Sequence, residues 1–340
     1  MSIFATNNHV EESEIIAAEG YDVTLGGACD LVIESCMDEM AVIEAMHAFD
    51  MAELEAVKES GNNETLTPAM EASMKEVWDK IKTFFKKMYE RIMGFFNNAM
   101  DFVNSIVMSG SAFAKKYEER LNKVSLSGFT YEMYEYNFES IFAKGISAVD
   151  ARVADVEKLM GKLSDMDVAK DSAVINTDLA KIQTEIEQNK DAHLTALRKE
   201  LSGAQTADAY RSELAKKFRN GGSKKSMTIT DLQKYVKFLK TSNGLIKHIE
   251  GCKNSMKAKF AAMDKDINKA AQNAMKADGN GQYAHIASKK AHLMRQCIQW
   301  NGSINNILTG YINEWSSAVK EAVFTYKNLC FKAMQHKPAK

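Results

Sequence analysis

Proline is nearly absent from the 340 residues, since only Pro68 and Pro338 occur. Because a proline inside a helix breaks it, this scarcity leaves long helical segments uninterrupted. Long apolar runs are missing too, and no stretch approaches the ~20 apolar residues that a membrane-spanning helix needs. The first residues also lack a basic segment followed by an apolar run. We therefore expect neither membrane insertion nor export by a standard signal.

Cysteine and histidine are few, and their spacing does not fit a metal site. The five cysteines form no C-x-x-C pair, which argues against a disulfide framework or a zinc ribbon. His248 and Cys252 are four residues apart and His292 and Cys297 five apart, but in a hairpin that turns near residue 280 the two pairs lie at different heights. We expect reduced structural thiols, no metal and no cofactor.

Catalytic signatures are lacking as well. The run from Gly221 to Lys225 has a glycine-to-lysine spacing that does not fit a phosphate-binding loop. The loop that begins at Asp278 starts like a calcium loop, but Tyr283 stands at its glycine position and Lys289 at its bidentate acid. No serine or cysteine has a base at a recognisable motif distance. The expectation is a protein that is not an enzyme.

The charges are unevenly distributed along the chain, although the net charge is only -1. Residues 1–67 contain fifteen acidic residues and one basic residue, Lys58. The remaining residues contain 43 basic and 30 acidic residues, so an acidic leader precedes a basic body. Two interpretations stay open: the leader docks on the basic body, or it masks the body from polyanions until it is removed.

The most strongly patterned stretch is 67–108, in which apolar residues recur every three and four positions, as on one face of a helix. Thr67 fits the N-cap, Pro68 fits the first helical position, and Ser109 to Ser111 mark the expected end. The apolar face is rich in aromatic side chains and would form an interface through Trp78, Phe84, Phe85, Ile92, Phe95 and Phe96. Its partner is this chain, a neighbouring subunit or a bilayer surface.

Further helices are expected along most of the remaining chain, so that helix should exceed about 60% of the residues. The pattern predicts two or three helices within 140–218, broken near 164–176, and a flexible joint at 220–223. Thr230 and Gln233 are placed as a capping box for a helix from 231 to about 277. A turn at 278–281 and a last helix from about 283 to 334 complete a C-terminal helical hairpin.

Residues 129–138 alternate aromatic and polar side chains, and they are the one stretch that we expect to be extended. The aromatic rings either pin a connection onto the helices or form a platform for stacking bases. The predicted fold is all-α: an elongated bundle with long amphipathic helices, the hairpin and this extended aromatic segment. The expected domains are an acidic leader with short helices (1–66), a region with the long basic amphipathic helix and polar helices (67–220), and the hairpin (221–340).

Two short motifs carry a resemblance to a known group of proteins. Ala17 to Glu19 and Ala69 to Glu71 are small-x-Glu sequences, similar to sites that the prohead proteases of large tailed bacteriophages cut. Together with an acidic leader and a lysine-rich helical body, they resemble the internal head proteins of such phages. The resemblance implies that Glu19 and Glu71 are processing sites of a propeptide. Glu19 is the more accessible, because Glu71 falls within the start of the long helix.

The lack of catalytic signatures predicts a protein that is not an enzyme, and the resemblance implies a virion structural protein inside the phage head, present in the host cytoplasm during assembly. A basic body tolerates packaged DNA through phosphate contacts that read no bases. The expected DNA contacts are Lys80, Lys82, Lys86, Lys87, Lys224 and Lys225. The expected partners are other virion proteins, copies of itself, nonspecific DNA and a prohead protease. Two alternatives stay open: a membrane-active protein that lays residues 77–106 on anionic lipid, and a self-assembling helical scaffold.

Overall fold

The computed structural model describes residues 68–166, 172–204, 206, 208–275 and 281–336. The chain divides into two units, residues 1–62 and 63–340, and everything described belongs to the second. This unit is an all-α helical bundle, and helix accounts for 87% of the structure. The prediction of a mostly helical protein is therefore confirmed.

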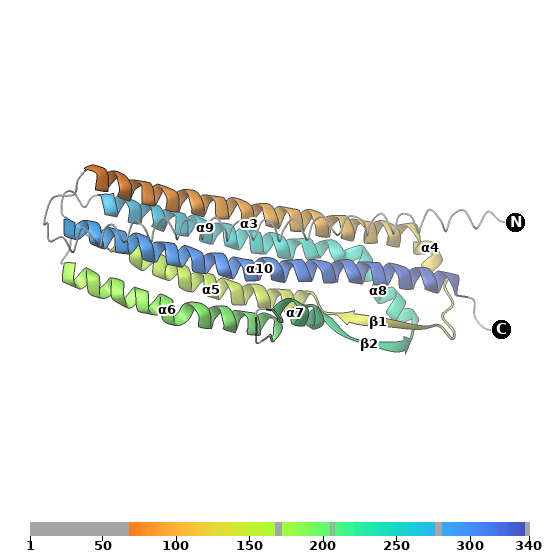
Figure 1. Ribbon diagram of the computed structural model, residues 1–340. Helices are drawn as coiled ribbons and strands as arrows, with labels where there is room; N and C mark the ends of the chain where they lie inside the picture. Colours follow the sequence, from red (N-terminus) through yellow and green to blue (C-terminus); the bar gives the residue numbers. More distant parts are fainter. Residues whose placement is uncertain (1–67, 167–171, 205, 207, 276–280, 337–340) are drawn as a thin grey trace. The chain divides into compact units, whose positions relative to one another are not determined.

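The helices and strands follow one another along the chain as shown in Figure 1. Their bounds are α3 Pro68–Lys116, α4 Glu118–Leu121, β1 Thr130–Tyr136, α5 Glu139–Asp165, α6 Ser172–Ser202, α7 Tyr210–Phe218, β2 Arg219–Ser226, α8 Ile229–Thr241, the 3-10 helix η1 Ser242–Leu245, α9 Ile246–Met275 and α10 Gly281–Gln335. The break expected near 164–176 lies between α5 and α6.

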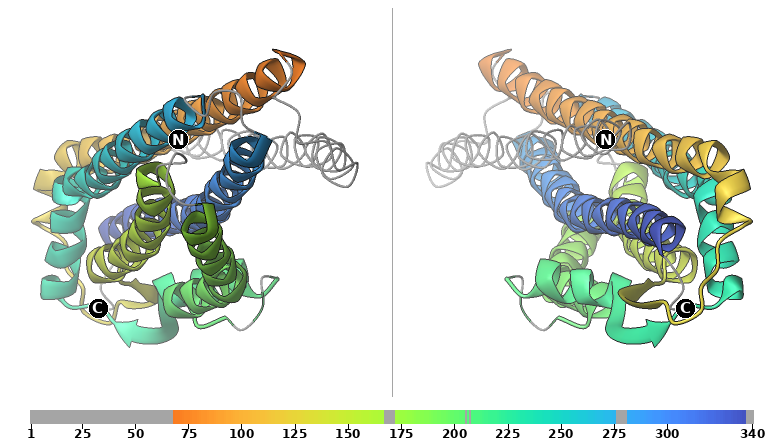
Figure 2. Two further views of the ribbon diagram at one scale, coloured as in Figure 1. Left: turned by 90° about the vertical axis from the view of Figure 1, so that its left-hand side faces the viewer. Right: turned by 90° about the vertical axis from the view of Figure 1, so that its right-hand side faces the viewer.

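The central helix is α10, which has 55 residues. It runs between the pair α3 and α9 on one side and the pair α5 and α6 on the other (Figure 2). Trp300, Tyr311 and Trp315 are at most 1% exposed, and residues on nearly every side of α10 are buried. A helix that is covered on nearly all sides belongs to the core of a bundle. Helix α9, expected to form a C-terminal hairpin with α10, packs chiefly against α3 and α5 instead of α10. Residues 278–280 of the expected turn of that hairpin lie outside the described residues.

Helix α3 is longer than its sequence indicated, because it continues through Gly110 to Lys116. The expected end at Ser109 to Ser111 is wrong for a packing reason. A Cβ at Gly110 would lie 3.1 Å from side-chain carbons of both Leu239 and Val323. Here glycine permits the close approach of α8 and α10 and does not end the helix.

The extended aromatic segment is confirmed as β1, and its partner is a second strand that the sequence did not indicate. β1 pairs antiparallel with β2, from Thr130 opposite Ser226 to Tyr136 opposite Arg219. The flexible joint expected at 220–223 is therefore wrong, since these residues belong to β2. Asn220, Gly222 and Ser223 pair with β1, and the register shifts at Gly221. The expected domain boundary between 220 and 221 falls inside this strand.

The segment after β2 begins with a capping box, two residues earlier than predicted. The Thr228 hydroxyl accepts from the Asp231 N–H, and the Asp231 carboxylate accepts from the Thr228 N–H. Thr228 has the extended backbone of an N-cap, φ -97° and ψ 162°, which corrects the assignment to Thr230 and Gln233. The single helix expected from 231 to 277 is also interrupted, because η1 separates α8 from α9.

Candidate nucleic-acid interface

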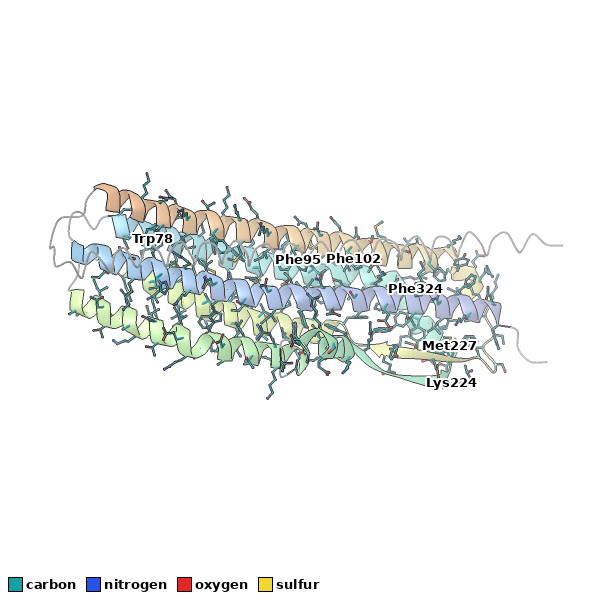
Figure 3. All side chains as sticks on the ribbon, viewed as in Figure 1. Trp78, Phe95, Phe102, Lys224, Met227 and Phe324 are labelled. Atoms are coloured by element: carbon teal, nitrogen blue, oxygen red, sulfur yellow. The ribbon has the colours of Figure 1, made fainter. Side chains whose placement is uncertain are left out.

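The aromatic face of α3 lies inside the bundle. All six residues expected on its interface are at most 8% exposed, and Trp78 and Phe96 are fully buried. The ring centroids of Phe85 on α3 and Phe260 on α9 are 5.3 Å apart. The aromatic face of α3 therefore packs against the same chain. This was one of the three partners considered, beside a neighbouring subunit and a bilayer surface. Figure 3 shows the side chains of α3 along the bundle.

The lysines expected to contact DNA on α3 lie in its first half. Lys86 and Lys87 are exposed, while Lys80 and Lys82 are partly buried. Lys80 forms an ion pair of 2.8 Å with Glu76, one turn earlier on the same helix. Lys86 lies 3.9 Å from Glu90, with side chains 77% and 60% exposed, so water screens this pair strongly.

The two lysines expected on the second basic segment lie far from those of α3. Lys224 is exposed on β2, directly opposite Glu132 of β1. The side chain of Lys225 lies outside the described part of the structure. Figure 3 labels Trp78 near the start of α3 and Lys224 at the opposite end of the bundle. The six lysines therefore do not form one continuous site.

The rings around β1 mostly contact one another. The hydroxyls of Tyr131 and Tyr235 are 2.9 Å apart, and Tyr235 stacks on Tyr326 with centroids 4.7 Å apart. Burial raises the pKa of Tyr136 to about 12 and raises the pKa of Tyr235 above its ordinary value. The tyrosine rings already contact other rings of the protein, so they have little surface left for a stacked base. Their packing therefore fits attachment of the sheet to α8 and α10 better than base stacking. Tyr134 is an exception, being 47% exposed.

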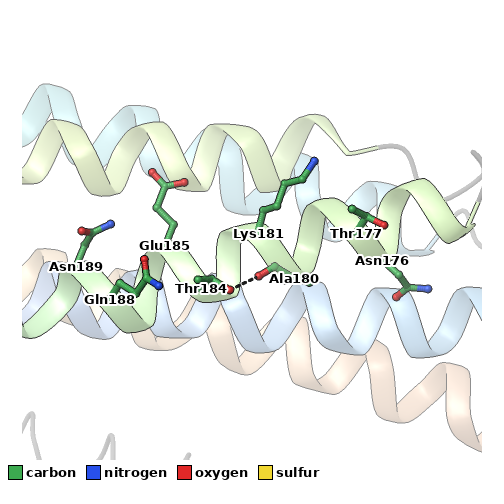
Figure 4. Close-up of a pocket in the computed structure, with 8 residues that line it drawn as sticks. All are labelled: Asn176, Thr177, Ala180, Lys181, Thr184, Glu185, Gln188 and Asn189. Carbon is green, nitrogen blue, oxygen red and sulfur yellow. Dashed lines mark hydrogen bonds between the residues drawn. The ribbon is translucent and has the colours of Figure 1, made fainter.

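An open groove of about 700 Å³ runs along α6 and is drawn in Figure 4. Its described lining comes from one helix, and all of the lining residues except Ala180 have polar or charged side chains: Asn176, Thr177, Ala180, Lys181, Thr184, Glu185, Gln188 and Asn189. The Thr184 hydroxyl donates to the Ala180 carbonyl at 3.0 Å, and Glu185 pairs with Lys162 at 2.9 Å. These side chains stabilise α6 and its contact with α5, and the described lining contains no nucleophile paired with a base.

A second groove, of about 360 Å³, lies between α4 and α8. Leu121, Leu232 and Val236 give it an apolar lining, and Lys237 and Lys240 belong to the same groove. Lys240 pairs with Glu118 of α4 at 2.5 Å. The ion pair joins α8 to α4 across the groove, so this part of the lining serves the fold.

The cysteines that the structure describes are inert. Cys252, Cys297 and Cys330 are free and buried, and burial raises the pKa of each thiol to about 12. The His248 ring lies tilted against the Phe142 ring, with ring centroids 5.8 Å apart. Within the described residues, no three His, Cys, Asp or Glu side chains gather as metal ligands would. The thiols therefore act as small apolar groups.

The two expected processing sites are Glu19 and Glu71. Glu19 lies outside the described residues. Glu71 lies in the first turn of α3, where its backbone is helical, although its side chain is not described. A protease needs an extended substrate, so cutting after Glu71 requires local unfolding of this turn.

Sequence reasoning missed the basic character of α8 and α9. Residues 231–275 contain nine lysines and four acidic residues, and the structure packs α9 beside α3. The excess of lysine over acidic residues in 231–275 could have been found in the sequence, but the position of α9 beside α3 depends on the fold.

Sequence reasoning also missed a buried amine. Lys290 is 0% exposed and donates to the Met166 carbonyl at 2.8 Å, beyond the end of α5.

Comparison of the chain with protein-family models, with curated proteins and with solved structures gives no match. Among the described helices, none combines the length and the hydropathy that crossing a lipid bilayer requires.

Proposed function

We propose that this chain is a non-enzymatic structural protein of a large tailed phage virion, internal to the head, whose basic body lies against packaged DNA. Its partners are copies of itself, other virion proteins and nonspecific DNA. Support for the DNA contact comes from how the bundle distributes charge, and support for the virion comes from the acidic leader and the small-x-Glu motifs.

The observation that carries the proposal is a difference in charge between the two sides of α10. Helices α3, α8 and α9 together contain 17 basic and 9 acidic residues, whereas α5 and α6 contain 8 basic and 10 acidic residues. Figure 2 shows α3 and α9 on one side of α10 and α5 and α6 on the other. A polyanion is therefore attracted to one side of the bundle.

The membrane-active alternative finds less support. It requires the apolar face of α3 on a bilayer, yet Trp78, Phe85 and Phe96 are at most 2% exposed. Exposing this face would separate α3 from α9 and α10 and lose the burial of large aromatic side chains. The basic surface itself attracts anionic lipid as well as DNA, so vesicles serve as the comparison in the test.

The test measures retention of the full chain on immobilised duplex DNA of random sequence, across a salt series, with anionic vesicles in parallel. We expect retention at low salt that falls steeply as salt rises and is the same for unrelated DNA sequences. Absence of retention at low salt would contradict the DNA contact. The virion assignment is tested separately, by detecting this protein by mass spectrometry in purified particles after their outer surface has been digested.

A further inference from the structure

We propose that duplex DNA lies along the seam between α3 and α9, and that its phosphates contact Lys82 and Lys86 of α3 and Lys253 and Lys257 of α9. We call these four residues the seam lysines. This inference rests on the proposed function, since it names the surface through which the body meets DNA. It differs from the sequence prediction because half of the set lies on α9, which the sequence alone did not place beside α3.

Contacts at two positions along the helix axes hold α3 against α9. The ring of Phe260 lies 5.3 Å from Phe85 and 5.6 Å from Tyr89, measured between centroids. Farther along, the Lys253 amine donates to the Asn97 side-chain oxygen at 2.7 Å. Residue numbers rise along α3 while they fall along α9, so the two helices are antiparallel at this seam. Lys257 therefore lies at a height between Tyr89 and Asn97.

The seam lysines consequently form a row. Lys82 and Lys86 are one turn apart on α3, and Lys257 and Lys253 continue the row on α9 to the height of Asn97. At 1.5 Å per residue the row covers roughly 22 Å. Lys86 and Lys257 are exposed, and Lys82 and Lys253 are partly exposed. Long lysine stems can pack on the seam while their ammonium groups reach solvent.

The charge around the row is strongly positive. Residues 80–100 of α3 contain five basic residues and one acidic residue, Glu90, and residues 251–265 of α9 contain four basic residues and one acidic residue, Asp264. B-form DNA carries one negative charge per ~1.7 Å of axis, so a row of about 22 Å faces roughly 13 phosphates on the two strands. Four lysines can therefore be engaged at once without base contacts.

The opposite side of the bundle provides a matched control. Lys158 of α5 and Lys181, Lys190 and Lys199 of α6 carry the same total charge as the seam lysines on helices that have no net positive charge. We call them the control lysines. Because both sets consist of four lysines on helices, replacing either set by glutamine changes the net charge equally and keeps good helix formers.

The experiment compares DNA retention of three full-length proteins across a salt series: the unsubstituted chain, a quadruple seam variant (Lys82, Lys86, Lys253 and Lys257→Gln) and a quadruple control variant (Lys158, Lys181, Lys190 and Lys199→Gln). Each phosphate contact contributes about 0.9 to the slope of log affinity against log salt. The seam variant should lose about 3 to 4 from this slope, whereas the control variant should lose less than about 1. Circular dichroism of each variant shows whether the helices are retained.

A fourth protein tests the same surface in the opposite direction. Glu90→Gln removes the acidic residue 3.9 Å from Lys86 and should raise DNA affinity several-fold at low salt, without loss of fold. Equal losses in the seam and control variants would overturn the seam but leave the proposed DNA contact intact, since net charge would then suffice. Failure of the unsubstituted chain to bind DNA would overturn both. Loss of vesicle binding with unchanged DNA retention in the seam variant would overturn DNA as the occupant.

Discussion

Gly145 of α5 lies directly against the ring of Tyr311 of α10: a Cβ at position 145 would come within 2.3 Å of the tyrosine ring carbon. The Tyr311 hydroxyl donates to the Ile141 carbonyl at 2.7 Å, and the side chain is fully buried. The ring cannot retreat without losing this hydrogen bond in the core. The contact between α5 and the central helix therefore depends on the missing side chain.

Gly145→Ala should accordingly destabilise the bundle, although alanine is the better helix former. We expect a loss of about 1 to 3 kcal/mol, the usual cost of overpacking a core, measured by chemical denaturation. Gly94→Ala is the control, because nothing lies within 4 Å of a Cβ placed there. That change should stabilise the protein by roughly 0.5 to 1 kcal/mol through helix propensity. Equal effects of the two substitutions would contradict the packing argument.

The aromatic face of α3 gives the second prediction. Phe85 is 2% exposed and packs on Phe260, so Phe85→Ala should cost about 3 to 5 kcal/mol of unfolding free energy. Tyr134→Ala, at a position 47% exposed on β1, should change stability by less than about 0.5 kcal/mol. A loss under ~1 kcal/mol for Phe85→Ala, together with loss of vesicle or partner binding, would favour the membrane or self-assembly alternative.

The start of α8 gives a third prediction, which separates two neighbouring threonines. Thr228→Ala removes the hydroxyl that caps the helix and should cost roughly 0.5 to 2 kcal/mol. Thr230 is exposed within the first turn, so Thr230→Ala should be close to neutral. Urea denaturation of the two variants measures the difference. A larger loss at Thr230 would restore the assignment made from the sequence.

Local sequence patterns predict which face of an element is buried, but they do not predict contacts between residues that are distant in sequence. The period of three and four on α3 and the alternation on β1 are local patterns that record which face is buried, and both predictions are confirmed. The end of α3 was misplaced because Gly110 is explained by Leu239 and Val323, which are distant in sequence. Likewise, β2 has the composition of a loop and becomes a strand by pairing with β1.

Two of the four seam lysines could be predicted from the sequence, and the other two depend on contacts between distant residues. Lys82 and Lys86 stand on a strongly patterned helix, so their exposed side could be inferred from periodicity. Lys253 and Lys257 join them only because α9 packs beside α3, as the Phe85–Phe260 contact shows. The sequence grouped Lys224 with the α3 lysines by charge alone, and folding places it at the other end of the bundle.

The buried thiols give a fourth prediction, on pH. Burial raises the pKa of Cys252, Cys297 and Cys330 from 9.0 to about 12. Between pH 9 and 12 these thiols ionise in the unfolded chain but stay protonated in the folded one, so the unfolding free energy should fall as the pH rises through this range. Alkylation at pH 8.5, followed by mass spectrometry, should modify them only in denaturant. Rapid labelling of Cys297 in the native protein would contradict its burial.

The last prediction concerns the acidic leader as a charge mask that processing removes. Residues 1–67 carry a net charge of -14 and the remaining residues carry +13. Cutting after Glu19 removes only four acidic residues, whereas cutting after Glu71 removes sixteen acidic residues and one basic residue and leaves a net charge of +14. Only the second cut would unmask the body. Its affinity for DNA should then rise at low salt, and the gain should fade as salt screens the charges.

The measurement compares DNA retention of the full chain with that of residues 72–340 across a salt series. Stronger retention of the shorter protein at low salt, converging with the full chain at high salt, is the expected result. The control is a full chain in which the acidic residues of 1–67 are replaced by their amides, since it removes the charge but keeps the length. Equal binding of the full and shortened chains at low salt would contradict masking. Processing is a separate question, and an intact Met1 or Ser2 terminus in mature particles would refute it, because a cut at either glutamate exposes a new N-terminal residue.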